Sequence, residues 1–178
     1  MLKTERLILR ILTEDDAFDI FAYSKDEAVG KNAGWKPHES LEESKQILNE
    51  VFLGKEDVFG ISLKQSGKLI GTLGLMPDFT RINGNARMLG YAIGKDAWGK
   101  GFMTEAVAAL LSYGFLEKGY GLISVSHYLD NFRSQRVIEK CGFQFEGVQR
   151  QAELRYDGTL MDKKWYSLTK EVFCRNLK

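Results

Sequence analysis

The chain has 178 residues, of which 44% are hydrophobic and 28% are charged, and its formal net charge is +1. This length predicts one domain over residues 1–178, with the composition of a globular protein. So small a net charge disfavours nucleic acid as a direct substrate. We expect no membrane association, because no apolar run approaches the ~20 residues of a span. The two cysteines, Cys141 and Cys174, form no disulfide framework, which favours a reducing, cytoplasmic setting.

The first half of the chain predicts a strand, two helices and a hairpin. Residues 6–12 are rich in Leu and Ile, which is typical of a buried strand. Capping-box patterns beginning at Thr13 and Ser40 predict two helices, with a loop over 27–37 between them. The second helix is expected to bury Ser44, Ile47, Leu48 and Val51. Strands over 58–64 and 69–76 flank Gln65-Ser66-Gly67, a hairpin signal.

The second half alternates between strand and helix patterns. A strand over 87–94 precedes a glycine loop and a helix over 103–118. A strand over 122–127, a helix over 132–140 and two strands around Asp157-Gly158 follow, the strands covering 145–154 and 160–169. This order predicts an α+β (mixed αβ) protein, with a mixed sheet of about seven strands and helices on both faces.

The most informative segment is Trp98-Gly99-Lys100-Gly101-Phe102-Met103-Thr104-Glu105-Ala106. Two glycines between a strand and a helix let a large anion approach the backbone, and the helix start offers N–H groups and about half a positive charge. A dinucleotide fingerprint is disfavoured because Thr104 replaces its third glycine, and a Walker loop fails on spacing. An ordinary glycine turn is the alternative.

Three segments together resemble the GNAT superfamily of acetyl-CoA-dependent N-acetyltransferases, and within it the RimJ/RimL-like branch, which includes ribosomal-protein N-terminal acetyltransferases. They are Thr4-Glu5-Arg6-Leu7-Ile8-Leu9-Arg10, then Gly90-Tyr91-Ala92-Ile93 with the glycine loop, and Asn131-Phe132-Arg133-Ser134 with Val137 to Phe143. The resemblance covers nearly the whole chain. It implies a sheet that splays between the 87–94 and 122–127 strands, with acetyl-CoA in the split. Superfamily members are often dimers, which by analogy alone leaves a homodimer open.

The resemblance also implies which residues bind the cofactor. Backbone amides of Gly99, Gly101, Met103 and Thr104 would hold the pyrophosphate, and Lys100 could add a charge. A strand N–H would meet the thioester oxygen, and Asn131 would contact the pantetheine arm. Trp98 and Met103 stand where the superfamily pattern has Gln or Arg and Gly or Ala. The expected cofactor-binding set, without any metal, is Tyr91, Ala92, Ile93, Trp98, Gly99, Lys100, Gly101, Phe102, Met103, Thr104, Asn131 and Ser134.

Amide formation from a thioester needs a base for the amine and a proton for the leaving thiolate. Ser134 is the candidate acid, because it shares the inward face of its helix with Val137 and Ile138 and matches the serine proposed in the branch. The superfamily's tyrosine is replaced by Ile138. Glu153, in Gln151-Ala152-Glu153, is the candidate base, with a pKa that burial would raise. His127 is the other candidate base. Alternatively, Glu153 is a surface acid paired with Arg155 or Lys164.

The sequence does not identify the amine that accepts the acetyl group. A protein N-terminal amine is suggested by the branch, while polyamines, aminoglycosides and other small amines stay open. Trp35, Phe79 and Tyr156 either wall the acceptor pocket or pack as core and lid. Two other function classes remain: an acyl-CoA-binding sensor without turnover, and an oligomeric scaffold without a cofactor.

Overall fold

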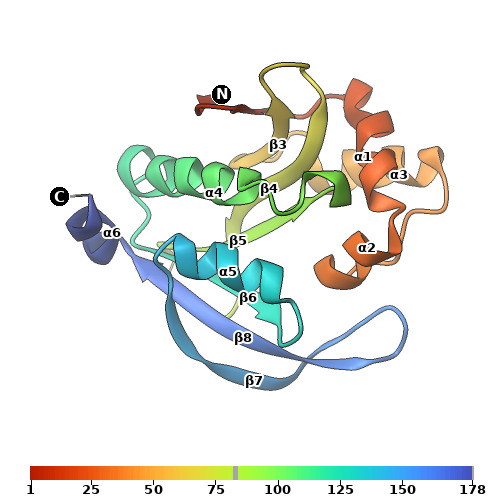
Figure 1. Ribbon diagram of the computed structural model, residues 1–178. Helices are drawn as coiled ribbons and strands as arrows, with labels where there is room; N and C mark the ends of the chain where they lie inside the picture. The colour runs from red at the N-terminus through yellow and green to blue at the C-terminus, as the bar shows by residue number, and fades with distance from the viewer. Residues whose placement is uncertain (82–83, 178) are drawn as a thin grey trace. The chain divides into compact units, whose positions relative to one another are not determined.

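The computed structural model describes residues 1–81 and 84–177, and within it the chain forms two compact units. Unit 1 consists of residues 1–74 and 91–106, and unit 2 of residues 75–90 and 107–178 as far as they are described. Three elements, drawn in Figure 1, pass from one unit into the other: strands β4 (Leu69–Pro77) and β5 (Ala86–Ile93) and helix α4 (Phe102–Ser112).

Unit 1 is built from antiparallel strands and short helices. Its strand order is β1-β2-β3-β4-β5, and the first four strands pair antiparallel. The hairpin turn at Gly67 joins β3 to β4, as its sequence predicts, with a φ of 72°. The elements that lie wholly in this unit are β1 (Leu2–Lys3), β2 (Leu7–Arg10), β3 (Val58–Leu63), α1 (Ala17–Ser24), α2 (Glu27–Ala33), α3 (Leu41–Ile47), and the short turns η1 (Glu14–Asp16), η2 (Leu48–Phe52) and η3 (Lys95–Ala97).

Unit 2 contains the rest of the sheet, in the order β4-β5-β6-β8-β7. Strands β5 and β6 pair parallel, whereas β8 pairs antiparallel with both β6 and β7. The fold is therefore α+β with a mixed sheet, as predicted. The remaining elements are β6 (Leu122–Tyr128), β7 (Gln144–Leu154), β8 (Leu160–Thr169), α5 (Phe132–Lys140), α6 (Lys170–Asn176) and the turn η4 (Tyr113–Glu117).

The β5–β6 ladder is short. It joins only Ala86 with Leu122 through Met88 with Ser124, although both strands continue beyond that pair.

Each unit has its own apolar core. In unit 1, α1 and α2 bury Ile20, Tyr23 and Val29 with Leu48 and Leu69. In unit 2, the predicted inner stripe of the helix after the glycine loop is fully buried, with Val107, Leu110, Leu111 and Phe115 at most 2% exposed. Helical spacing of apolar residues thus identified this face correctly.

Among the described residues the sheet has eight strands, in line with the expected sheet of about seven, and the additional one is the two-residue β1, which is too short to leave a pattern. Two other sequence expectations need correction. The expected loop over 27–37 contains α2, which Asp26 caps by accepting from the Ala28 N–H and which ends at Gly34 with a φ of 90°. Val51 is 50% exposed rather than buried, because η2 is a π-helical turn and shifts the register of that face.

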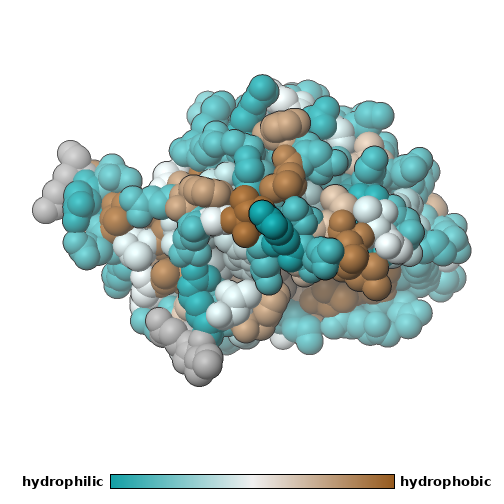
Figure 2. Space-filling model, turned by 90° about the horizontal axis from the view of Figure 1, so that it is seen from below, coloured by the Kyte–Doolittle hydropathy of each residue, from teal (hydrophilic) through white to brown (hydrophobic). Residues whose placement is uncertain are grey.

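The surface shows no single apolar field in the view of Figure 2, where brown hydrophobic patches alternate with teal hydrophilic side chains. Within the part of the chain that the structure describes, no helix has the length and hydropathy needed to cross a bilayer.

Candidate functional site

At the end of β5, one edge of the backbone faces β4 and the other edge points away from β4. The Gly94 N–H donates to the Ile70 carbonyl of β4 at 2.9 Å. Because successive residues of a strand point their N–H and C=O groups to alternate edges, Ala92 also faces β4, while Tyr91 and Ile93 point to the opposite edge. Three strand residues, Tyr91, Ala92 and Ile93, are predicted to contact the cofactor. Of these, Tyr91 and Ile93 direct their backbone N–H groups away from β4.

Trp98 connects the glycine loop to this strand. Its indole N–H donates to the Ile93 carbonyl at 2.9 Å, and its ring packs against the apolar core of unit 1. That carbonyl lies on the edge of β5 directed away from β4. Trp98 thus holds the start of the glycine loop against the end of β5. The position of Trp98 in the sequence motif does not indicate this role.

The loop itself has the geometry expected of an anion cradle. Gly99 and Gly101 have φ values of 73° and 78°, a region that side chains rarely adopt. A Cβ added at Gly99 would meet nothing within 4 Å, so the backbone there is open to a ligand. Met103, the larger residue in the motif, is only 6% exposed, so its side chain is not on the open side of the loop.

Helix α4 is preceded by a glycine, a residue with no side-chain oxygen. Its first intrahelical bond runs from the Glu105 N–H to the Gly101 carbonyl at 3.1 Å, which makes Gly101 the capping position. Four other helices are capped by side-chain oxygens, from Asp26, Ser40, Asn131 and Thr169. A glycine at this position leaves the helix start to an external anion. The residues present therefore fit the pyrophosphate of acetyl-CoA.

The second predicted motif lies in unit 2, at the start of α5. The Asn131 side chain accepts from the Ser134 N–H at 3.1 Å and so caps the helix. Ser134 is 9% exposed, and Ile138, one turn later, is completely buried. The predicted inward face of this helix is confirmed, and the cap holds the backbone of Ser134 in place.

Glu153, the candidate base, has two hydrogen-bond donors as partners. It accepts hydrogen bonds from the Tyr128 hydroxyl and from the Lys163 ammonium, and Lys163 also lies 5.2 Å from the centre of the Tyr128 ring. Burial favours a raised pKa for this carboxyl, but the two donors outweigh burial and hold its pKa below the usual value. The expectation of a raised pKa is therefore wrong, and the partner is Lys163 rather than Arg155 or Lys164.

The register of the sheet places this cluster on one face. Tyr128 of β6 lies opposite Lys163 of β8, and facing residues of an antiparallel pair point to the same side. Their neighbours His127 and Lys164 also form a pair, which must point to the other side. Lys164 donates to Gln135 of α5 at 3.3 Å, so this second face is the one that α5 covers.

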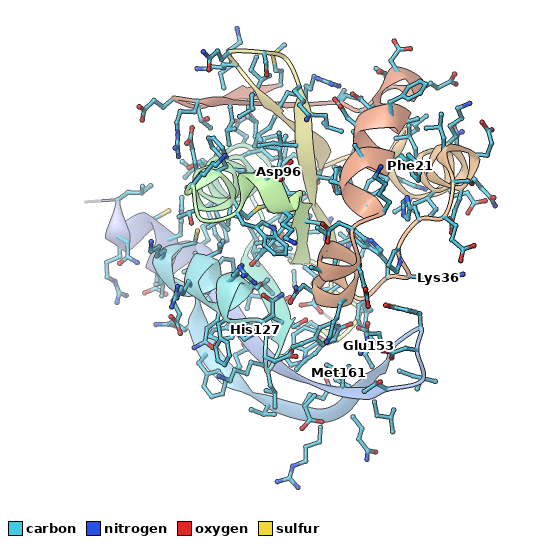
Figure 3. All side chains as sticks on the ribbon, turned by 45° about the vertical axis from the view of Figure 1, so that its right-hand side comes forward. Phe21, Lys36, Asp96, His127, Glu153 and Met161 are labelled. Carbon is cyan, nitrogen blue, oxygen red and sulfur yellow. The ribbon has the colours of Figure 1, made fainter. Side chains whose placement is uncertain are left out.

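Ser134 and Glu153 accordingly approach from opposite faces of the unit 2 sheet. Figure 3 shows Glu153 beside Met161, its partner across the β7–β8 pair, and His127 on β6. His127 is 4% exposed, its Nδ1 lies 2.7 Å from the Tyr128 carbonyl, and its Nε2 lies 3.4 Å from the Tyr166 hydroxyl. These partners and its burial among them argue against His127 as the base.

The three aromatic candidates differ in their surroundings. Trp35 packs against the apolar core of unit 1, which matches the core reading. Phe79 and Tyr156 are 79% and 45% exposed. Both therefore remain available to a ligand, and each lies in a turn rather than in a helix or strand.

Two residues of the Glu153 cluster, Tyr128 and Lys163, escaped the sequence reasoning. Burial and the hydrogen bond to Glu153 raise the pKa of Tyr128, so its hydroxyl stays protonated and can donate. The signal that could have found them is the pairing of β6 with β8, which places Tyr128 opposite Lys163. The predicted site residues thus form three separate groups. Residues 91–104 lie together in unit 1. In unit 2, Asn131 contacts Ser134, and Glu153 contacts its two donors elsewhere in the unit.

Comparisons with known proteins agree with these features. Residues 6–144 match the model of the acetyltransferase (GNAT) domain. The chain is 34% identical to an uncharacterized N-acetyltransferase, YoaA, of Bacillus subtilis over 96% of this chain and 97% of that protein. It is 26% identical to the ribosomal protein uS5-alanine N-acetyltransferase of Escherichia coli, over 92% of this chain and 85% of that protein.

A solved structure shares the fold. It is a spermidine N-acetyltransferase from Vibrio cholerae in complex with CoA and spermine, with a TM-score of 0.79 and 21% sequence identity. The match covers 95% of this chain and 98% of that one. At this identity the likeness speaks for the fold alone.

Proposed function

Because the chain belongs to the GNAT family of acetyltransferases, we propose that it transfers the acetyl group of acetyl-CoA to the α-amine of a peptide chain. It is an N-acetyltransferase that uses acetyl-CoA, as its family does. The proposal concerns the acceptor, the residues that act on it, and direct attack of the amine on the thioester. One observation carries it: Glu153 already accepts hydrogen bonds from Tyr128 and Lys163.

A carboxylate held in this way is a weak base. With its pKa below the ordinary value, Glu153 cannot remove a proton from a strongly basic ammonium at a useful rate. It can accept a hydrogen bond from an amine that is already neutral. Once the new C–N bond forms, the nitrogen becomes acidic, so a carboxylate is then a sufficient proton acceptor.

This requirement separates the acceptor classes by their own pKa values. An α-amine has a pKa of about 7.7–8.0, so about a third of it is neutral near pH 7.5. An alkyl amine such as a lysine side chain has a pKa of about 10.4, so only about one part in a thousand is neutral. A site with a weak base therefore favours the α-amine by roughly two orders of magnitude in reactive acceptor.

The electrostatics of the cluster point the same way. A polyamine carries several positive charges and is best bound by uncompensated carboxylates, but Lys163 lies against Glu153 and neutralises it. The acceptor of the E. coli relative, an alanine of ribosomal protein uS5, is a protein residue. This similarity supports a peptide acceptor for the present protein and its assignment to the RimJ/RimL-like branch.

Other residues would divide the remaining tasks. Acetyl-CoA supplies an activated acetyl group on a thiol leaving group. The glycine loop and the start of α4 would bind its pyrophosphate, and the Ile93 N–H, on the outward edge of β5, would donate to the acetyl oxygen. From the α5 face, Ser134 would donate a proton to the departing thiolate and take one back from solvent. From the other face, Glu153 would accept the proton that the new amide nitrogen loses and pass it to solvent.

The test is a competition within one molecule. A short peptide with a free N-terminal alanine and one internal lysine is incubated with the protein and acetyl-CoA, and fragment masses locate the acetyl group. Spermidine at equal concentration serves as the small-molecule competitor. We expect modification of the α-amine with release of one thiol per acetyl group. Acetylation of spermidine or of the lysine side chain in preference to the α-amine contradicts the proposal.

A further inference from the structure

Arg6, on the segment between β1 and β2, contacts the glycine loop through the outer end of its guanidinium group. One terminal nitrogen donates to the Lys100 carbonyl at 2.9 Å. The guanidinium carbon lies 4.6 Å from the centre of the Phe102 ring. A Cβ added at Gly101 would lie 3.4 Å from the other terminal nitrogen. The side chain thus covers three consecutive loop residues on one side.

Holding that carbonyl fixes the direction of an amide. The Lys100 C=O and the Gly101 N–H belong to the same peptide group, which is planar and trans, so the two bonds point in opposite directions. Because Arg6 holds the oxygen on its own side, the Gly101 N–H must point away from Arg6. Gly101 adopts a φ of 78°, and because glycine has no Cβ its backbone can take other orientations if the carbonyl is released.

Glu105, in the first turn of α4, holds Arg6 in this position. Its two oxygens accept from the Arg6 Nε at 2.7 Å and from the Arg6 backbone N–H at 2.8 Å, and the Thr4 hydroxyl adds a third bond at 2.6 Å. These bonds outweigh burial and lower the pKa of the Glu105 carboxyl. The carboxylate beside the helix start is therefore matched by a cation and does not repel an anionic ligand.

From this geometry we infer that Arg6 is a positioning residue for cofactor binding: it aims the Gly101 N–H at the pyrophosphate of acetyl-CoA, and Glu105 holds Arg6 in place. The inference rests on the glycine loop being the pyrophosphate site. It gives the opening Thr4-Glu5-Arg6 motif a role in a loop almost 100 residues away. Arg6 itself touches no reacting atom, since it acts through a peptide group.

The neighbouring strand residue Arg10 is a matched control. It forms an ion pair with Asp16 at 2.5 Å, comparable to that of Arg6 with Glu105, and the bonds recorded for it reach no loop residue. Replacing either arginine by methionine keeps an unbranched side chain that reaches about as far as the arginine Nε, and it removes the donors. A purely structural effect should appear in both variants, whereas an effect on the loop should appear only in Arg6→Met.

The experiment compares coenzyme A with pantetheine, which carries the thiol arm without the diphosphate, by calorimetry and without any acceptor amine. We expect Arg6→Met to weaken coenzyme A binding roughly 10- to 100-fold, the effect of losing one charge-assisted hydrogen bond, and to leave pantetheine binding unchanged. Arg10→Met should bind both as the wild type does. Unchanged coenzyme A affinity in Arg6→Met, or an equal loss for both ligands, overturns the inference.

A second measurement needs no variant. Amide hydrogen exchange of the wild-type protein should show the Gly101 N–H protected on addition of coenzyme A and unprotected with pantetheine. If coenzyme A binds without protecting Gly101, the inference fails. Neither experiment involves an acceptor, so a failure here is distinct from a failure of the proposed α-amine specificity.

Discussion

The properties of Glu153 depend on a single neighbour, Lys163. Replacing Lys163 with methionine removes a cation and a hydrogen-bond donor, so the pKa of the Glu153 carboxyl should rise. The titration of the Glu153 carboxyl, followed by the NMR signal of its side-chain carbon, should then move to higher pH. Lys164→Met is the matched control, because Lys164 points to the α5 face and contacts Gln135. A shift of equal size in both variants would contradict the face assignment.

Ser134 is argued to protonate the leaving thiolate. Ser134→Ala should reduce kcat by up to about 10²–10⁴-fold, the range for one proton-transfer group, while the affinity for coenzyme A changes little. Steady-state kinetics with calorimetry would separate the two effects. Ser112→Ala is the control, because its hydroxyl only donates to Ala108 within α4. Full activity of Ser134→Ala would assign the proton to another donor.

Two buried histidines make stability depend on pH. Burial lowers the pKa of His38 and His127 below the ordinary 6.5, so the unfolded chain binds protons more readily than the folded one. The free energy of unfolding should therefore decline as pH falls below about 6.5, before the carboxylates titrate near pH 4. Denaturant titrations between about pH 7 and pH 5 measure this, and a double His→Gln variant should have a flatter profile. An equally steep decline in that variant would exclude the histidines as its cause.

Helix α5 shows how an element can couple stability to chemistry. Asn131→Ala removes the side-chain cap and should lower the free energy of unfolding by about 1 kcal/mol, as N-cap substitutions do. Because the cap bonds the Ser134 backbone, kcat should fall as well. Asn131→Asp keeps an acceptor oxygen and should retain most of the stability.

Helix α6 offers the matched control for this cap. Thr169→Ala removes a bond of the same kind, from the Val172 N–H to the Thr169 hydroxyl at 3.3 Å. Thermal unfolding should show a comparable loss of stability, with kcat unchanged. An equal loss of rate in both variants would mean that stability alone, and not the position of Ser134, controls turnover.

Elements with strong local signals could be predicted from the sequence. Helix α5 begins after Asn131 and ends before Gly142 as expected, because both end signals and the apolar face are local. Helix α2 was missed although Asp26 and Gly34 mark its ends, since its seven residues offer little apolar periodicity. The π turn at η2 leaves no signal in the sequence, which is why Val51 was assigned to the wrong side.

At the scale of the whole molecule, the site could be predicted only where it is local in sequence. The glycine loop and the Asn131–Ser134 cap are contiguous motifs, so their residues could be named in advance. The Glu153 cluster depends on the register between β6 and β8, which brings Tyr128 opposite Lys163. Arg6 and Glu105 meet across 99 positions of sequence for the same reason. Long-range register follows from the fold, and a single sequence does not specify it.

We propose that a weakly basic Glu153 suits an acceptor that loses its own proton readily. The most direct test measures kcat/KM against pH for two peptides whose N-terminal amines differ in pKa by about one unit, both at saturating acetyl-CoA. The account predicts that the rising limb of each profile follows the pKa of its acceptor amine, so the two limbs are displaced by that unit. Limbs that coincide for both peptides, at a pKa belonging to the protein, would contradict it.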